Sequence, residues 1–208
     1  MTYDWEIRLK HYPHFDAPLS LANITKLVSE PDSVRRNKFY PFLRYTQTWQ
    51  PYRTSRPGKP GKPERKTRPI RYASRRDAYI FSYYRHLLVE PYERLLAANN
   101  LSESIIAYRK LRQPAGGGKS NIELARDAFD NIRQLGNCAA VALDISSFFE
   151  SLDHAILKAQ WLRVIGESRF PQDHAAVFKA VTRYAVVDIS EAYERLEPFA
   201  FTRTHSLR

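Results

Sequence analysis

The spacing of apolar side chains along the chain predicts several amphipathic helices. The longest covers residues 75–100, where apolar positions recur every three or four residues, as one buried helical face requires. Ser74 is placed to cap its start, Asn99 and Asn100 end it, and Pro91 should kink or split it. A shorter helix is predicted at 21–28, where Ser20 can cap its start and Pro31 follows its end. Another is predicted at 121–135, with Ser120 and Glu123 as a capping box and Gly136 as a stop. Two more are predicted at 154–165, between Asp153 and Gly166, and at 174–184, after Asp173.

Apolar runs without helical spacing predict a few strands. The strongest is residues 138–145, a near-continuous apolar run that should be a buried strand with Asp144 near its carboxyl end. Residues 104–109 are a shorter strand candidate, and residues 68–73 read as a short extended segment. Residues 1–50 are expected to form a helical lead-in. The fold class that follows is α+β, mostly helical with a few strands.

The positive charge of the chain is concentrated in one segment. The 208 residues carry a formal net charge of +11, and residues 53–76 hold ten basic side chains and one acid, so this window accounts for +9. Its first part contains several Pro and Gly residues, which exclude a helix or a central strand there. A mobile, solvated linker is the simplest interpretation. Tyr52 and Tyr72 flank the basic side chains, however, and favour an extended loop that binds phosphates.

Composition narrows the class of protein further. Cys138 is the single cysteine, which excludes an internal disulfide framework and a multi-cysteine zinc site. No apolar run approaches the roughly 20 residues that cross a bilayer, and the first residues do not resemble a secretory leader. A cytoplasmic protein without a membrane partner is therefore expected. A sequence pI near 9.8 points to a polyanionic partner, with nucleic acid first and an acidic membrane surface second.

One group of residues, around Asp144, could form a catalytic metal site. A carboxylate that leaves a buried strand, such as Asp144, is placed to hold a hard cation such as Mg²⁺, which neutralises phosphate oxygens. Phe148 and Phe149 follow four and five residues later. An isolated aspartate at this place more often only caps the next turn, so the neighbouring motifs decide its interpretation.

Three motifs resemble those of reverse transcriptases, in the order of that family. VALDISSFFESLDHAIL resembles the first palm motif, KTRPIRYASRRDAYI the first finger motif, and IIAYRKLRQPAGGGKSNIELARDAF the second finger motif. They span roughly residues 65–165, and the bacterial retron, group II intron and phage-defence enzymes look nearest. The resemblance implies right-hand polymerase fingers and the first part of a palm. Residues 1–50 would be the lead-in, 51–136 the fingers and 137–208 the first palm segment.

The resemblance also implies roles for individual residues. Asp144 would be a catalytic metal ligand, with the backbone carbonyl of Ile145 as a second contact to Mg²⁺. Phe149 would lie under the sugar of the incoming dNTP and exclude a 2′-OH, while Phe148 would pack in the core. Arg68 and Arg71 would contact the nucleotide triphosphate or the template. The expected contacts to nucleic acid come from further basic side chains: Arg65, Lys66, Arg75, Arg76 and Arg109, the last of which could equally be a structural salt-bridge partner.

The chain departs from the family in one large respect. The polymerase reaction needs a second acidic cluster, Tyr-x-Asp-Asp, and these 208 residues contain no Asp-Asp pair. The Leu-Pro-Gln-Gly motif that precedes it in the family is missing too. We therefore expect a truncated or frameshifted reverse transcriptase fragment that does not polymerise alone. Its partners would be an RNA template and a DNA or RNA primer. A dedicated noncoding RNA, and a role in phage defence, stay open.

Two other functions are compatible with the sequence. GGGKS followed by a helix resembles the end of a P-loop, with Asp144 in the place of a Walker B acid, but Gln113 stands where the first glycine is required. A flexible turn before a capped helix is the simpler interpretation of GGGKS. The other alternative is a nucleic-acid-binding module without catalysis, for which a basic loop with aromatic side chains would suffice.

Overall fold

The computed structural model describes residues 5–12, 14–50, 65–111, 116–145 and 147–195. The chain divides into two compact units. The first unit comprises Met1–Leu88 and Gly166–Arg208, and the second unit comprises Val89–Ile165. The described residues contain both helices and a small sheet, which confirms the α+β class.

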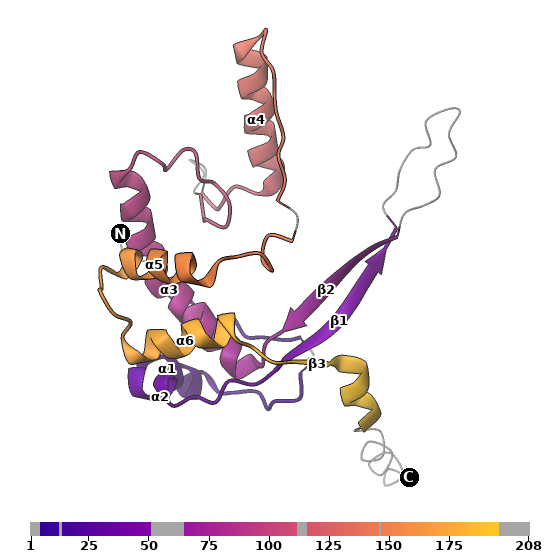
Figure 1. Ribbon diagram of the computed structural model, residues 1–208, viewed down its shortest axis with the longest axis vertical. Helices are drawn as coiled ribbons and strands as arrows, with labels where there is room; N and C mark the ends of the chain where they lie inside the picture. The colour runs from indigo at the N-terminus through magenta and orange to yellow at the C-terminus, as the bar shows by residue number, and fades with distance from the viewer. Residues whose placement is uncertain (1–4, 13, 51–64, 112–115, 146, 196–208) are drawn as a thin grey trace. The chain divides into compact units, whose positions relative to one another are not determined.

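A three-stranded sheet lies in the first unit, in the order β2-β1-β3. The central strand β1 (Phe42–Trp49) pairs antiparallel with β2 (Lys66–Tyr72) and parallel with the short β3 (Val186–Asp188) (Figure 1). β2 confirms the extended segment predicted at 68–73. β1 corrects the expected helical lead-in, because its eight residues FLRYTQTW are mostly β-branched and aromatic types that favour strands. The Pro/Gly-rich residues 51–64 lie outside the described residues.

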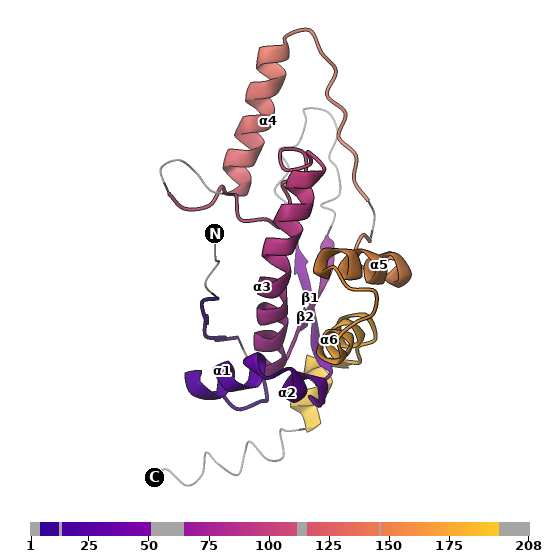
Figure 2. The same cartoon turned by 90° about the vertical axis from the view of Figure 1, so that its left-hand side faces the viewer.

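The helices of the first unit confirm most of the predicted caps. They are α1 (Leu21–Ser29), α2 (Pro31–Arg35), α6 (Gln172–Thr182) and the first part of α3 (Arg75–Ala98). The Ser20 side chain accepts a hydrogen bond from Asn23 N, as an N-cap does. α1 ends before Pro31, which then opens α2, because proline suits the first turn of a helix. α2 packs against α6, as Figures 1 and 2 show.

The long helix α3 begins where the sequence predicts. Ser74 Oγ accepts a hydrogen bond from Asp77 N at 3.0 Å, and the helix ends at Ala98, shortly before Asn100 adopts a left-handed conformation. The sequence predicts that Pro91 kinks or splits this helix; Pro91 lies inside α3, which continues as one helix, so of these two alternatives the split does not occur. Proline removes one backbone hydrogen bond, but the residues on both sides keep helical geometry.

The core of the first unit joins α1, α2, α3, α6 and the sheet. Its apolar members are at most 7% exposed, and they are Ile24, Leu27, Val28, Val34, Leu43, Tyr79, Ile80, Tyr84 and Val177. Next to them, Phe81 of α3 stacks on Phe39 and on Phe42 with ring centroids 5.6 and 6.2 Å apart. These contacts fix the start of β1 against α3 and thereby orient the β1–β2 hairpin.

The second unit contains the rest of α3, α4 (Asn121–Leu135) and α5 (His154–Ile165). The predicted caps are confirmed here as well. Glu123 Oε2 accepts from Ser120 N at 2.5 Å, Asp153 Oδ1 accepts from Ala155 N at 2.7 Å, and Gly136 ends α4 with a positive φ of 67° that glycine adopts easily.

The strands predicted for the second unit are wrong. Residues 138–145 belong to no strand, and Val141 and Leu143 are 80% and 92% exposed. Residues 104–109 contain turns and irregular backbone but no strand. A strand is stable only when a neighbour completes its hydrogen bonds, and β1, β2 and β3 all lie in the first unit.

No helix within the described ranges is long and apolar enough to cross a membrane.

Candidate nucleic-acid interface

The β1–β2 hairpin presents one face that combines basic and aromatic side chains. In the antiparallel register Trp49 lies opposite Lys66, and Gln47 lies opposite Arg68. Because opposite residues of an antiparallel pair project to the same side, these four side chains share a face. Lys66, Arg68 and Gln47 are exposed, and Trp49 is half-buried. This end of the hairpin is therefore accessible to a polyanion.

Arg68 is held in place by an aromatic ring. Its guanidinium carbon lies 5.2 Å from the centroid of the Trp49 ring, which is a cation–π contact. The contact leaves the guanidinium edge available to donate hydrogen bonds to phosphate oxygens. A basic group stacked on an indole is an arrangement that suits both the backbone and the bases of a nucleic acid.

Three tyrosines continue this face toward the base of the hairpin. The Tyr72 ring stacks on Tyr45 and on Tyr12 with centroids 5.5 and 5.3 Å apart. A hydrogen bond with the Tyr45 side chain, aided by burial, raises the pKa of Tyr72. Burial, aided by the Asp16 carboxylate, raises the pKa of Tyr12 to about 12. The phenols of Tyr72 and Tyr12 therefore stay neutral and do not repel phosphates.

The opposite face of the hairpin is occupied by contacts within the first unit. Arg71 places its guanidinium carbon 5.6 Å from the centroid of the Tyr184 ring, and Arg44 pairs with Asp188 at 3.6 Å. Of the two arginines predicted to contact the triphosphate or template, Arg68 is exposed, whereas Arg71 is half-buried. Arg65 is exposed directly before β2.

Arg75 and Arg76, both predicted to bind nucleic acid, have contacts inside the first unit. The Arg75 guanidinium donates to the carbonyl oxygens of Asp16 and Tyr12 and lies 3.5 Å from Asp16 Oδ1, with 17% of its side chain exposed. Arg76 donates from Nε to Asn37 Oδ1 at 2.9 Å but stays exposed. Arg75 therefore anchors the N-terminal segment to α3, while Arg76 keeps an accessible charge.

Arg109 forms an internal ion pair, which agrees with the structural alternative stated for it. Its Nε and Nη2 donate to the two carboxylate oxygens of Glu93 at 2.9 and 2.6 Å, and its side chain is 7% exposed. The Arg109 hydrogen bond lowers the pKa of Glu93. Further bonds to the carbonyl oxygens of Ser102 and Ile105 close the turn after α3.

The palm-motif residues are exposed. Asp144 lies in the irregular segment before Phe148, and the neighbouring Ile145 is 64% exposed. Phe149 is 64% exposed and contacts the rings of Phe148 and Tyr108 at 5.3 and 6.1 Å. Phe148 is 42% exposed, so its predicted place in a core is wrong. The reason is the missing strand, without which no core forms around it.

The described residues do not fit a magnesium site. No group of three or more His, Cys, Asp or Glu side chains within the described ranges is arranged to hold a metal ion. Asp144 offers one carboxylate on an exposed segment, and the Ile145 carbonyl is not fixed by a strand. Mg²⁺ requires near-octahedral oxygen ligands held in place, and a single unsupported carboxylate does not provide them.

The GGGKS segment also has a defined contact. Lys119 Nζ pairs with Asp127 Oδ2 of α4 at 2.6 Å, and Lys119 N donates to Leu111 O at 2.8 Å. The P-loop requires a strand before the glycines, and residues 104–111 contain none. Gln113 lies outside the described residues. Lys119 thus closes a turn before a capped helix.

Sequence reasoning missed the contribution of β1 to the interface. Tyr45 and Trp49 fall within residues 1–50, for which the sequence predicts a helical lead-in and no strand. The alternation of Tyr45, Gln47 and Trp49 with Arg44, Thr46 and Thr48 is the period-two signal that could have revealed the strand.

Comparison with known proteins identified no relative of this chain. No protein-family model matches the chain, and no curated protein matches its sequence. The class that the fold and the interface define is therefore an α+β protein with a basic, aromatic hairpin.

Proposed function

We propose that this chain binds RNA through the β1–β2 hairpin, as the fingers and first palm segment of an RNA-directed DNA polymerase. The observation that carries the proposal is the exposed face on which Arg68 stacks over Trp49 beside Lys66. Guanidinium and ammonium groups bind backbone phosphates, and the indole offers a surface for a base. The three sequence motifs supply the polymerase context.

The proposed ligand is an RNA template with a DNA or RNA primer. In a polymerase assembly Asp144 would contribute one carboxylate toward Mg²⁺ and Phe149 would border the sugar of the dNTP. The other acidic ligands would have to come from outside these 208 residues, which contain no Asp-Asp pair. The chain alone is therefore proposed to bind primed RNA without extending the primer.

The test is binding of a fluorescent primed RNA by the purified chain. The variant Lys66→Ala/Arg68→Ala should lose at least tenfold in affinity. The matched control Lys26→Ala/Arg169→Ala removes the same charge from exposed positions on α1 and after Gly166, and it should bind like the wild type. Equal affinities of the two double variants would contradict the proposed interface. Labelled dNTP incorporation by the chain alone would contradict the proposed lack of polymerisation.

A further inference from the structure

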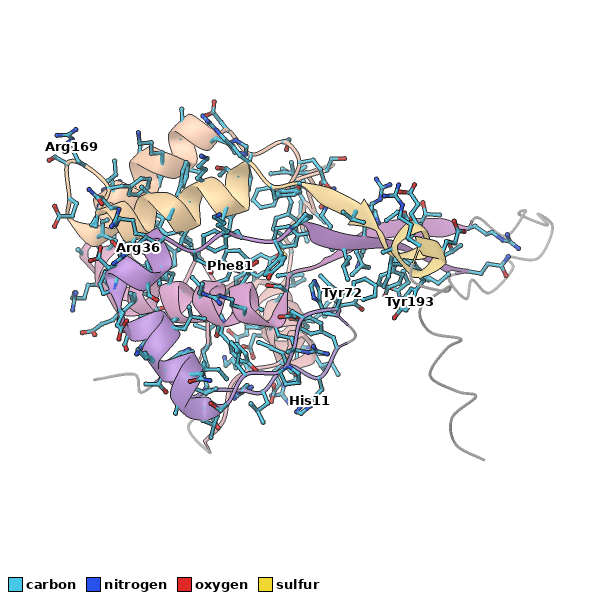
Figure 3. The ribbon with its side chains drawn as sticks, turned by 90° about the horizontal axis from the view of Figure 1, so that it is seen from below. His11, Arg36, Tyr72, Phe81, Arg169 and Tyr193 are labelled. Carbon is cyan, nitrogen blue, oxygen red and sulfur yellow. The ribbon has the colours of Figure 1, made fainter. Side chains whose placement is uncertain are left out.

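A groove in the first unit lies apart from the hairpin face. Its cavity volume is about 440 Å³, within the range of small-ligand pockets. It lies between the end of α2 and the start of α3. Figure 3 shows Arg36 of this groove at a distance from Tyr72 on the hairpin. The charged and aromatic side chains that line the groove are Glu30, Asp32, Arg36, Lys38, Tyr40 and Arg76.

The wall of the groove is built on a buried carboxylate. Asp77 is 1% exposed and accepts hydrogen bonds from Asn37 Nδ2 at 2.9 Å and from Tyr40 N at 2.8 Å. Asn37 in turn accepts at Oδ1 from Arg76 Nε at 2.9 Å. This chain of hydrogen bonds fixes the guanidinium of Arg76 and the backbone of Tyr40 on the same wall.

The basic side chains of the groove have N–H groups that are available for further hydrogen bonds. No hydrogen bond or ion pair among the described residues engages Nη1 or Nη2 of Arg76 or the ammonium of Lys38. Arg36 lies 3.6 Å from Asp32 and keeps 69% of its side chain exposed. Three cationic side chains with free N–H groups therefore line the same groove, and such groups are suited to bind a phosphate dianion.

The acidic groups explain why a simple anion is not the best ligand. Glu30 has no ion pair within the described part of the chain, and Asp32, although paired with Arg35 at 3.0 Å, keeps spare acceptor capacity. Carboxylates commonly accept hydrogen bonds from ribose hydroxyls. The ring of Tyr40, 54% exposed, offers a surface on which a base can stack.

We infer that this groove binds a ribonucleoside 5′-monophosphate group, with its phosphate on Arg76, Lys38 and Arg36. The ribose hydroxyls face Glu30 and Asp32, and the base lies on Tyr40. Two sources share this chemistry, a free nucleotide and the 5′-phosphorylated end of an RNA. The inference does not depend on the proposed function of the hairpin, because the two sets of residues are separate.

Calorimetric titration of the full chain with AMP tests the inference. We expect saturable binding that Lys38→Ala weakens about tenfold, as loss of one charge-assisted hydrogen bond does. Lys38 has no contact within the described residues whose loss would unfold the chain. The matched control Lys26→Ala should bind AMP like the wild type. Adenosine and 2′-deoxy-AMP should each bind at least fivefold more weakly than AMP.

Competition by short RNAs separates the two sources. If 5′-phosphorylated RNA displaces AMP and the same RNA with a 5′-OH does not, the groove holds an RNA end; if neither RNA displaces AMP, it holds a free nucleotide. Both results support a nucleotide site. Absence of saturable AMP binding together with equal affinity for the two RNAs would overturn it. Equal binding of AMP by Lys38→Ala and wild type would also overturn it. Binding of the 5′-OH RNA by the hairpin is measured in the same titrations. Failure of RNA binding by the hairpin is therefore distinguished from failure of nucleotide binding by the groove.

Discussion

The phenol of Tyr84 in α3 donates a 2.5 Å hydrogen bond to the carboxylate of Asp173 in α6. Tyr84 is 2% exposed, and burial together with this bond raises its pKa far above the usual range of tyrosine. His174, the next residue of α6, meets the Tyr84 ring edge-on at 4.9 Å between centroids. A charge-assisted bond inside the first unit thus joins two helices that are far apart in the sequence.

Replacing Tyr84 by phenylalanine should destabilise the first unit. The change removes the donor and leaves Asp173 without this bond, at a cost of about 1–3 kcal/mol. Urea unfolding followed by circular dichroism measures the loss. Tyr83→Phe is the matched control, because the Tyr83 hydroxyl has no hydrogen-bond partner among the described residues and its ring packs on Trp5. Equal midpoints for the two variants would show that the bond contributes nothing.

The first unit should lose stability as the pH falls below about 6.5, the ordinary pKa of histidine. Burial lowers the pKa of His174, so below 6.5 the unfolded chain binds more protons than the folded chain, and the free energy of unfolding decreases. At pH values above 6.5 both states are neutral and this contribution is complete. Urea midpoints between pH 5 and 8 measure it. His174→Phe keeps an aromatic ring beside Tyr84 and should flatten the profile; an unchanged slope would exclude His174 as its cause.

Arg109→Ala should affect the second unit and leave RNA binding intact. In this variant the Glu93 carboxylate and the backbone carbonyls lose their hydrogen bonds from Arg109, which should lower the free energy of unfolding by about 2–4 kcal/mol. Hydrogen exchange of residues 93–109 should increase strongly. Arg94→Ala, which breaks an exposed pair with Glu90, is the control and should change exchange little. A loss of RNA affinity without faster exchange would instead make Arg109 a direct contact.

Salt dependence should identify the phosphate contacts of the hairpin. Each phosphate neutralised on a single strand contributes about −0.7 to the slope of log K against log salt. Lys66→Ala/Arg68→Ala should therefore make the slope less negative by about 1.4. Binding titrations at several salt concentrations measure this slope. An unchanged slope combined with weaker binding would mean that these side chains act indirectly.

Trp49→Leu should weaken RNA binding without changing that slope. Leucine keeps apolar volume but removes the stacking surface and the cation–π contact of Arg68, at a cost of about 1–3 kcal/mol. Thr48→Val, on the opposite face of β1, is the control and should bind like the wild type. If both variants bind equally well, bases do not stack on Trp49.

Local signals in the sequence were sufficient for the helices. Ser20, Ser74, Ser120 and Gly136 all occupy the cap positions predicted for them, because a cap depends on the nearest few residues. Strands depend on distant partners. Val141 and Leu143 have strand-like neighbours, but the described residues of the second unit offer no strand to pair with. Tyr45, by contrast, lies in a strand because residues 66–72 complete its hydrogen bonds.

The candidate site was predicted in part. The basic character around Arg65, Lys66 and Arg68 was evident from charge alone, since exposed side chains keep their charge in most folds. The burial of Arg109 against Glu93 and of Arg75 against Asp16 was not evident, because sixteen and fifty-nine residues separate the partners. Whether an arginine serves a ligand or the fold depends on such distant carboxylates.

The pairing of β1 with β2 determines which changes in chain length the hairpin tolerates. Its register begins at Leu43 and Tyr72, which are held by the core and by the Tyr12 ring. Residues added between the strands would leave this register intact and cost little in loop entropy. Deletion of a single residue between Arg68 and Tyr72 would instead turn Lys66 and Arg68 to the opposite side. Among related sequences, insertions should therefore collect between positions 50 and 65 and be absent from 66–72.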